Sequence, residues 1–310
     1  MKKEQESKRR IFSISFLLAN VLFVALLVAI AIPGKTQPRT SIPFYVATAI
    51  IEVLFLWRYM ANGRKRSTCH IVIIVWLFLI VWEVVSTDLR LTHPVLIPIP
   101  ENVFAVFPNK ADELALNVQS SMILLIEGFI TSLIAGNIIG LFVGWMPKLR
   151  EAVYPIAHVL APVPAIVFAP YLVMLLPSFK AAAVAVIFLG IFWPTLRNTI
   201  LRVESMNKNI INSARMLDLP THVMIFRVLV PYTYPAVVTG LKTQLPTAML
   251  MLVMAEMYGA TSGLGYFVIN YTNYANYTNV VAGIIMVGIV VTILDWLVAL
   301  LIRKTVKWSE

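Results

Sequence analysis

The chain alternates long apolar runs with short polar connections. Eight of these runs are long enough to cross a hydrocarbon layer of about 30 Å as helices, at a rise of 1.5 Å per residue. The runs cover residues 11–32, 42–61, 70–87, 120–146, 155–177, 181–201, 233–257 and 280–302. No small-residue cleavage site follows the first run, so we expect it to be a retained helix and not a signal peptide. The pattern predicts an all-α integral membrane protein with about eight transmembrane helices.

Composition supports this interpretation. Hydrophobic residues make up 59% of the chain and charged residues 13%, whereas soluble domains carry about 25% charged residues. The net charge of +10 is unevenly placed: with the N-terminus inside, 19 of the 25 lysines and arginines fall in cytoplasmic loops or termini. This is the positive-inside arrangement of membrane proteins. We therefore expect both termini in the cytoplasm and no nucleic-acid partner.

The segment 202–231 is a polar connection between two apolar runs. It contains Glu204, Lys208, Arg215 and Asp218. Each such charge costs about 3 kcal/mol at the centre of a bilayer, or roughly 10 kcal/mol together. The segment is therefore expected to stay in water as a cytoplasmic loop.

Small residues recur at every fourth position of the run 120–146. They are Gly128, Ser132, Gly136, Gly140 and Gly144. A ridge of this kind lets two helix backbones approach closely in lipid, where the hydrophobic drive between helices is weak. The ridge predicts a helix-packing face, either within one subunit or between two subunits.

The sequence holds no motif for catalysis or for a metal. No G-x-x-x-x-G-K-[ST] phosphate loop occurs, and the stretch SGLGY at 262–266 lacks the three glycines of a dinucleotide fingerprint. The four histidines are far apart, and the single cysteine, Cys69, can form neither a metal-binding pair nor an internal disulfide. We expect no enzyme activity, no metal and no cofactor in this chain.

Five further stretches carry motifs in a fixed order. They are IPIP at 97–100, APVPAIVFAP at 161–170, FWPTLRNT at 192–199, TGLK at 239–242 and AEMYGATSGLGYFV at 255–268. Together they resemble the permease subunits of bacterial ABC importers, in the branch that takes up nitrate, sulfonates and taurine. The resemblance covers about 70–308 and implies a type I-like permease domain at 70–310, preceded by an N-terminal extension, 1–69, with two additional helices.

The resemblance also implies the partners. Importers of this kind combine two permease subunits, identical or different, with a dimer of cytoplasmic ABC ATPases and an extracellular or periplasmic solute-binding protein. ATP binds to the ATPase partner, so none is expected on this chain. Membrane lipid of the bacterial cell membrane surrounds the spans.

The family carries a cytoplasmic E-A-A-x-x-x-G loop, followed by a hydrophobic-Pro pair, that docks on the ATPase as a coupling helix. In this chain Asn212-Ser213-Ala214 stands in place of E-A-A, and Asp218 in place of the glycine. We expect a short helix capped by Asn209 or Asn212 and ended by Leu219-Pro220, with Met216, Leu217 and Leu219 as an exposed apolar knob. The predicted coupling residues are Asn212, Ser213, Ala214, Arg215, Met216, Leu217, Asp218, Leu219 and Pro231.

The last matched stretch predicts a second candidate site, at the outer end of the span 233–257. Glu256 is expected to position a glycine-rich turn that forms part of an outer gate or a docking site for the binding protein. The residues of this predicted site are Glu256, Gly259, Ser262, Gly263 and Gly265. Glycines there allow close backbone approach.

Two other functions stay open at this point. A secondary transporter driven by an ion gradient would be expected to show midplane acidic residues and an internal repeat, and no convincing repeat is present. A non-transporting membrane scaffold is favoured only by the altered coupling loop. The resemblance implies an importer permease for a small polar solute, and the sequence does not identify that solute.

Overall fold

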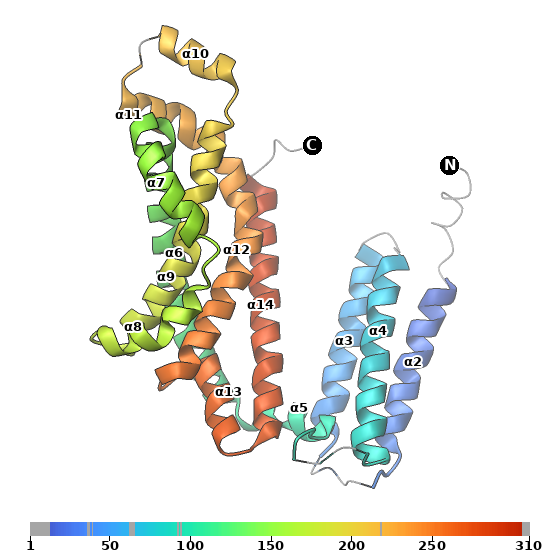
Figure 1. The fold of residues 1–310 in the computed structure, drawn as a ribbon. Helices are drawn as coiled ribbons and strands as arrows, with labels where there is room; N and C mark the ends of the chain where they lie inside the picture. The colour runs from blue at the N-terminus through green and yellow to red at the C-terminus, as the bar shows by residue number, and fades with distance from the viewer. Residues whose placement is uncertain are drawn as a thin grey trace. The chain divides into compact units, whose positions relative to one another are not determined.

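The computed structural model describes residues 13–35, 38, 40–61, 66–91, 93, 95–217 and 219–305. Within these ranges all regular secondary structure is helical, as Figure 1 shows, which confirms the predicted all-α fold. The elements are α2 (Ile14–Ala31), α3 (Ile42–Ala61), α4 (Arg66–Glu83), η1 (Val84–Asp88), α5 (Pro100–Asn109), α6 (Ala111–Trp145), α7 (Pro147–Leu160), η2 (Ala165–Phe168), α8 (Ala169–Leu175), α9 (Phe179–Glu204), α10 (Lys208–Met216), α11 (Thr221–Val223), η3 (Met224–Leu229), α12 (Val230–Gly259), α13 (Leu264–Asn273) and α14 (Tyr277–Thr305).

Among the described residues, seven helices are long and apolar enough to cross a membrane. The eighth expected span, 155–177, is not a continuous helix: it lies in a pair, Pro147–Leu160 and Ala165–Leu175, bent by 82°. The physical reason lies in Pro162 and Pro164 between the two parts. Proline has no backbone N–H and its ring clashes with the preceding turn, so two of them end a helix even inside an apolar run.

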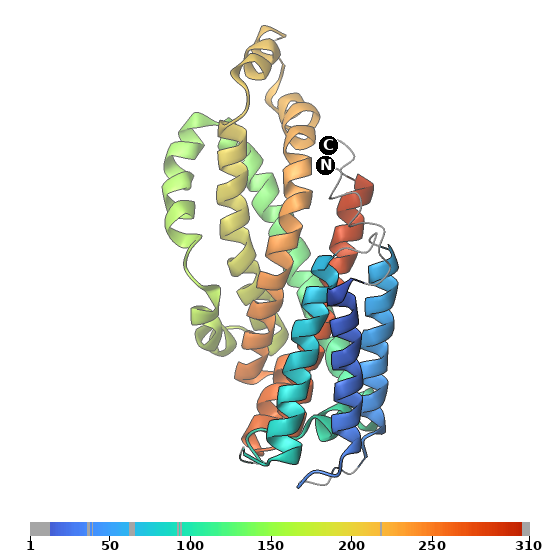
Figure 2. The same cartoon turned by 90° about the vertical axis from the view of Figure 1, so that its right-hand side faces the viewer.

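The described chain divides into two compact units. The first comprises residues 1–114 and 270–284, and the second comprises 115–269 and 285–310. In the first unit α2, α3 and α4 lie side by side, as the two views of Figures 1 and 2 agree. Four of the ten buried residues in their shared core are aromatic, namely Phe44, Phe55, Tyr59 and Trp76.

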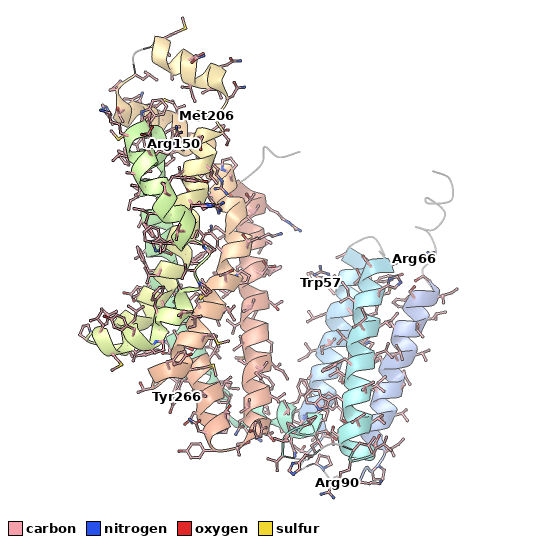
Figure 3. All side chains as sticks on the ribbon, viewed as in Figure 1. Trp57, Arg66, Arg90, Arg150, Met206 and Tyr266 are labelled. Carbon is pink, nitrogen blue, oxygen red and sulfur yellow. The ribbon has the colours of Figure 1, made fainter. Side chains whose placement is uncertain are left out.

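The first unit also contains the short helix α5. Phe104 on α5 stacks on Phe44 of α3, with ring centroids 5.0 Å apart. Figure 3 places Arg66 and Arg90 at opposite ends of the three-helix bundle. The bundle therefore has a basic residue at each end and apolar side chains between them, as expected for helices that cross a bilayer.

The second unit is built on a core that joins α6, α8, α9, α12 and α14. Leu125 of α6, Ile187 of α9 and Leu252 of α12 are among its fully buried members. In Figure 3 Arg150 and Met206 lie at one end of this unit and Tyr266 lies at the other. We refer to these as the α10 end and the α13 end.

The small-residue ridge of α6 faces α9 of the same chain. A Cβ atom built on any of its four glycines would come within 2.7–2.9 Å of a Cβ atom on α9. The pairs are Gly128 with Ile187, Gly136 with Thr195, Gly140 with Thr199 and Gly144 with Val203. The two members of each pair are 59 residues apart in the sequence, so α6 and α9 run parallel and stay in contact over the whole ridge.

Two polar side chains on this face form hydrogen bonds, one within α6 and one between α9 and α6. Ser132, the fifth ridge residue, is fully buried and donates a hydrogen bond to the Phe129 carbonyl at 2.8 Å. The Thr199 hydroxyl donates to Asn137 on α6 at 3.0 Å. The ridge predicted a packing face either within one subunit or between two subunits. In the structure a helix of the same chain covers this face.

The expected cytoplasmic loop 202–231 is mostly helical. Helix α9 continues to Glu204, and α11, η3 and α12 run on from one another from Thr221. Among the residues of this segment that the structure describes, the irregular backbone is confined to the short stretches on either side of α10. Element η3 is a π-helix in which the Val230 N–H reaches back to the Ile225 carbonyl. This wide turn directly precedes Pro231, whose missing N–H breaks the regular hydrogen-bond ladder.

Candidate functional site

Glu256 lies at the α13 end of the second unit and is completely buried. Its Oε1 atom accepts a hydrogen bond from the Ser121 hydroxyl at 2.6 Å, and its Oε2 atom accepts one from the Gly265 N–H at 2.7 Å. Helix α13 begins at Leu264, so the Gly265 N–H is one of the donors that have no partner within that helix. A carboxylate at a helix N-terminus is also favoured by the helix dipole.

The neighbouring donors of the same helix start are satisfied from α6. The Gly263 N–H donates to Asn117 Oδ1 at 2.7 Å, and the Leu264 N–H donates to the Ser121 hydroxyl at 2.8 Å. Three consecutive backbone amides are thus bound by three side chains from two helices. The turn before α13 is fixed in place by these contacts.

Two glycines allow the carboxylate to come this close. Gly263 has φ +125°, a backbone conformation that side-chain-bearing residues rarely adopt, and a Cβ there would collide with the Glu256 carboxylate. A Cβ on Gly265 would collide with the Val253 carbonyl and with Glu256 Cβ at 2.8 Å. The two glycines are therefore required by close packing against α12.

The other two predicted turn residues have different surroundings. The Ser262 and Ser120 hydroxyls are 2.7 Å apart. Gly259 ends α12 and lies against Val173 and Phe179, away from the carboxylate. The structure thus brings Glu256, Gly263 and Gly265 into direct contact, and places Ser262 and Gly259 beside them.

Sequence reasoning missed Asn117 and Ser121. A signal was present, because 117 and 121 are four residues apart and Gly128 follows Ser121 after seven. These spacings place all three on the face of α6 that carries the small-residue ridge. The polar positions extend that ridge toward the α13 end.

Helix α10 forms the predicted coupling segment at the opposite end of the unit. It spans Lys208–Met216. The predicted cap at Asn209 or Asn212 is wrong: Asn207 Oδ1 accepts the Asn209 N–H at 2.9 Å, and the Asn207 carbonyl accepts the Ile210 N–H. Asn has the same capping chemistry at each of these positions, and the helix begins two residues earlier than its polar pattern indicated.

The predicted apolar knob is partly formed. Met216 is 88% exposed and Leu217 is 71% exposed, which is unusual for such large apolar side chains. Leu219 does not share this exposure, because it packs against a buried cluster within the unit. The exposed knob in the structure therefore consists of Met216 and Leu217.

The remaining predicted coupling residues divide by position. Asn212 and Ser213 are exposed on α10, whereas Ala214 is buried. Arg215 also lies in α10, and Pro231 lies in the first turn of α12. Asp218 lies outside the described residues.

A buried cluster attaches α10 to the ends of three long helices. Ala214 and the partly buried Ile211 and Leu219 contact it from the α10 segment. Its other members come from the ends of α6 and α9 and from η3, namely Leu141, Val203, Met206, Met224, Ile225 and Leu229. Helix α10 is therefore packed directly against the ends of α6 and α9 and against η3, which runs into α12.

One ion pair is described at the α10 end of the unit. Arg150 of α7 approaches Glu204 of α9, with Nη1 and Oε1 3.6 Å apart and both side chains partly exposed. An exposed pair of this kind contributes little to stability. Among the described residues no three His, Cys, Asp or Glu side chains lie close enough together to hold a metal ion.

Comparison with known proteins identifies the family. Residues 136–307, more than half of the chain, match the family model described as the binding-protein-dependent transport system inner membrane component. The putative aliphatic sulfonates transport permease protein SsuC of Bacillus subtilis is 27% identical over 251 residues, which is 80% of this chain and 91% of that protein. The nitrate import permease protein NrtB of Leptolyngbya laminosa is 28% identical over 276 residues, which is 89% of this chain and 91% of that protein.

Two further comparisons agree. The taurine transport system permease protein TauC of Escherichia coli is 26% identical over 237 residues, which is 74% of this chain and 86% of that protein. A chain of the methionine ABC transporter MetNI in an inward-facing conformation has a TM-score of 0.51 and 20% identity, and the match covers 61% of this chain and 95% of that one. This last likeness shows the fold. The chain belongs to the binding-protein-dependent transport system inner membrane component family, and it is a multi-pass permease subunit of an ABC-type importer.

Proposed function

We propose that this permease moves a small polar solute inward and is driven by a cytoplasmic ATPase that docks on α10. Its relatives are named for nitrate, aliphatic sulfonates and taurine, and we propose a solute of the same kind here. In this proposal an external binding protein delivers the solute, a second permease subunit completes the pathway, and ATP binds only to the ATPase. Residues 1–69 are an addition to the permease domain of residues 70–310.

The orientation follows from the placement of charge. With both termini in the cytoplasm, the α10 end faces the ATPase and the α13 end faces the outside. The Glu256 turn then forms part of the outer gate or of the surface that receives the binding protein. Its carboxylate holds the turn in place and takes no part in bond making or breaking.

The observation that carries the proposal is the pair Met216 and Leu217, 88% and 71% exposed on a segment otherwise rich in polar residues. An apolar knob on a short helix is the form that fits a hydrophobic groove on a partner. Ala214 of the same helix is buried in the cluster that joins the ends of α6, α9 and η3. Docking at the knob therefore acts directly on the long helices.

The test is copurification of the tagged full-length chain from its native membrane. We expect the wild-type chain to bring down a subunit with a phosphate-binding loop, identified by mass spectrometry, and to carry ATPase activity. Leu217→Asp should lower the yield of that subunit at least tenfold, because a charge in an apolar groove is left unpaired.

The matched control is Leu116→Asp. Leu116 is 66% exposed, close to the 71% of Leu217, but it lies near the start of α6 at the opposite end from α10. This variant should retain the ATPase subunit. Full retention by Leu217→Asp, with a melting temperature equal to that of the control, would contradict docking at the knob.

A further inference from the structure

The first unit contains a polar cavity of about 470 Å³ between α5 and the start of α14. Seven of its nine lining residues are polar, although 59% of the chain is hydrophobic. They include a lysine, two threonines and four asparagines, namely Asn102, Asn109, Asn276 and Asn279. The volume lies within the range of small-molecule sites, about 300–1,000 Å³. The concentration of carboxamides in so apolar a protein indicates a binding role.

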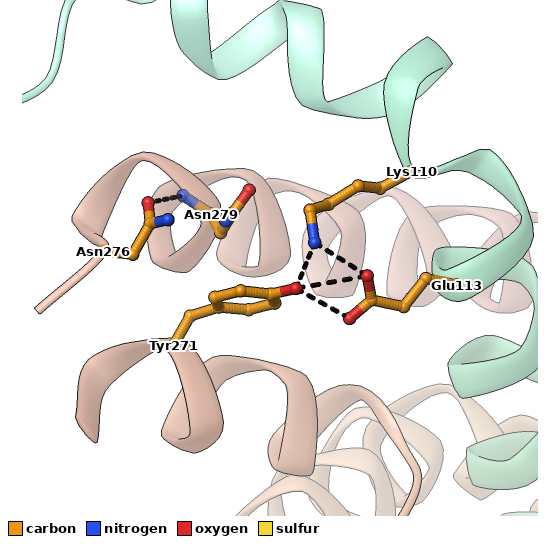
Figure 4. Close-up of polar contacts among 5 residues, drawn as sticks. All are labelled: Lys110, Glu113, Tyr271, Asn276 and Asn279. Atoms are coloured by element: carbon orange, nitrogen blue, oxygen red, sulfur yellow. Dashed lines mark hydrogen bonds and ion pairs between the residues drawn. The ribbon is translucent and has the colours of Figure 1, made fainter. Parts of the chain in front are cut away.

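Lys110 is held rigidly at the edge of this cavity. Its Nζ atom lies 2.8 Å from Glu113 Oε2 and also donates to the Tyr271 hydroxyl, which in turn donates to Glu113 Oε1 at 2.9 Å (Figure 4). Burial alone would lower the pKa of Lys110, but the hydrogen bonds and charges of Glu113 and Tyr271 raise it above its ordinary value. The ammonium stays charged, and two of its three N–H donors have partners among the described residues.

Asn279 is the second fixed group. Its residue is only 6% exposed, it lines the cavity, and its carboxamide has no hydrogen-bond partner among the residues that the structure describes. The amide atoms of Asn279 are not fully enclosed by protein, so a ligand in the cavity can reach them. A ligand that accepts a hydrogen bond from this amide would give it the partner that the described residues do not supply.

The backbone beside the cavity forms the capped end of α13. Ala275 has φ 52°, a conformation that is uncommon for a residue with a Cβ. It is held there by hydrogen bonds from the Ala275 N–H to the Thr272 carbonyl at 3.0 Å and from the Asn276 N–H to the Tyr271 carbonyl at 2.9 Å. These two bonds form the Schellman arrangement that ends many helices, and they fix Asn276 directly before α14.

The charges around the cavity indicate what charge its ligand would carry. Lys110 lines the cavity and carries one positive charge, and its counterion Glu113 is not among the lining residues. The N-terminus of α14, a helix of 29 residues, adds the equivalent of roughly half a positive charge at the same place. Glu113 lies 2.8 Å from the Lys110 ammonium and offsets part of its charge, so the cavity suits a ligand with one negative charge better than a ligand with two.

We propose that this cavity binds a small monovalent oxyanion of the sulfonate, nitrate or carboxylate type. The oxygens of the anion accept hydrogen bonds from the Lys110 ammonium and from the Asn279 and Asn276 carboxamides. Thr278 supplies a further hydroxyl donor from the lining. The site lies wholly in the first unit, and its binding does not depend on the docking of an ATPase at α10.

The test is equilibrium binding to the purified full-length chain in nanodiscs of phosphatidylcholine, without any ATPase. The probes are radiolabelled ethanesulfonate, with nitrate and sulfate as competitors. We expect saturable binding of ethanesulfonate, competition by nitrate, and competition by sulfate at least tenfold weaker. Because no ATPase is present, failure here is distinguishable from failure of the proposed coupling.

Two pairs of variants locate the site. Lys110→Gln and Asn279→Leu should each weaken ethanesulfonate binding at least tenfold. The matched controls Lys180→Gln and Asn273→Leu change exposed residues outside the lining and should leave it unaltered. If Asn279→Leu does not fold, Asn279→Asp replaces it, because that change keeps the shape and places a repelling charge in the cavity.

Three results would overturn the proposal. They are the absence of saturable binding, equal affinity for sulfate and ethanesulfonate, and unchanged binding in correctly folded Lys110→Gln and Asn279 variants. A repeat in nanodiscs containing phosphatidylglycerol distinguishes a free solute from a lipid headgroup. We expect unchanged binding there, and loss of binding would assign the cavity to lipid phosphate and overturn its assignment to a solute.

Discussion

The two ends of the second unit differ in how their exposed and buried groups are satisfied. At the α13 end, a turn without regular structure is closed by backbone N–H groups that donate hydrogen bonds to the side chains of Asn117, Ser121 and Glu256. At the α10 end, a regular helix leaves Met216 and Leu217 in solvent. The first region is complete within the chain, whereas the second exposes apolar surface that a partner would cover.

The difference shows where each region obtains its stability. Buried polar groups at the α13 end must all be paired, so each of them is tied to a particular neighbour. The exposed side chains at the α10 end contribute almost nothing to folding and remain available for binding. Substitutions should therefore affect folding at one end and assembly at the other.

The largest expected effect comes from Gly265→Ala. The added Cβ would collide with the Val253 carbonyl and Glu256 Cβ, and neither can move without displacing α12. We expect a loss of at least about 3 kcal/mol in the free energy of unfolding, or failure to fold, measured by thermal melting in detergent. Gly288→Ala is the control, because nothing lies within 4 Å of its built Cβ. Equal melting temperatures for the two variants would contradict the close contact.

Glu256→Gln tests the hydrogen bonds themselves. Glutamine keeps one acceptor, but its NH₂ group would face the Gly265 N–H or the Ser121 hydroxyl in place of an oxygen. We expect a loss of about 1–3 kcal/mol, because a buried donor is left without a partner, and faster hydrogen exchange at the start of α13. Glu151→Gln, at an exposed position on α7, should leave both quantities unchanged.

Leu217→Ser tests whether the exposed apolar side chains at the α10 end serve binding and contribute little to folding. The side chain is 71% exposed, so its removal should change the free energy of unfolding by less than about 0.5 kcal/mol. Association with an ATPase subunit should nevertheless weaken measurably, because the serine presents less apolar surface. A large drop in melting temperature would show that Leu217 is packed within the chain and would remove the contrast between the two ends.

The smallest effect concerns a second buried carboxyl group, in the first unit. Glu101 on α5 is 1% exposed, and its contact with the Thr87 hydroxyl is 3.4 Å long. Burial raises the pKa of Glu101 above its ordinary 4.5. The folded chain therefore favours the neutral acid, so its contribution to stability is complete below pH 4.5 and is lost as pH rises through the raised pKa.

Melting temperatures between pH 4 and pH 9 check this sign. The wild-type chain should lose stability with rising pH across that window, and Glu101→Gln should lose less because its side chain cannot ionise. Glu151→Gln again serves as the control and should follow the wild-type curve. An equal slope for Glu101→Gln would show that Glu101 is already charged in the folded chain.

The spans were predictable because the bilayer imposes a simple requirement on them. Residues 42–61 were expected as a helix and form α3 with the same bounds. The break within 155–177 was missed because apolar content is high throughout, while Pro162 and Pro164 act only through backbone geometry. Mean hydropathy over a window does not register the loss of two N–H donors.

The candidate sites were predictable only in part. Glu256 and its glycines stand close together in the chain, so a short motif locates them. Ser121 is 135 residues from Glu256 and Asn117 is 146 residues from Gly263, and these pairs meet only through the packing of helices. The carboxamide cavity of the first unit likewise combines residues near 105 with residues near 277, and no local pattern links them.

The fixed interval of 59 residues between partners on α6 and α9 also constrains how the chain can vary in length. An insertion of one residue inside α6 between Gly128 and Gly144 would turn every later glycine by about 100° around the helix axis and carry it away from its partner. An extra residue in the bent region around Pro162 would lengthen the interval between the two members of every pair. It would leave the spacing within α6 and within α9 unchanged, so each pair could still meet. Insertions and deletions among relatives should therefore fall in that region and be absent from the paired stretches.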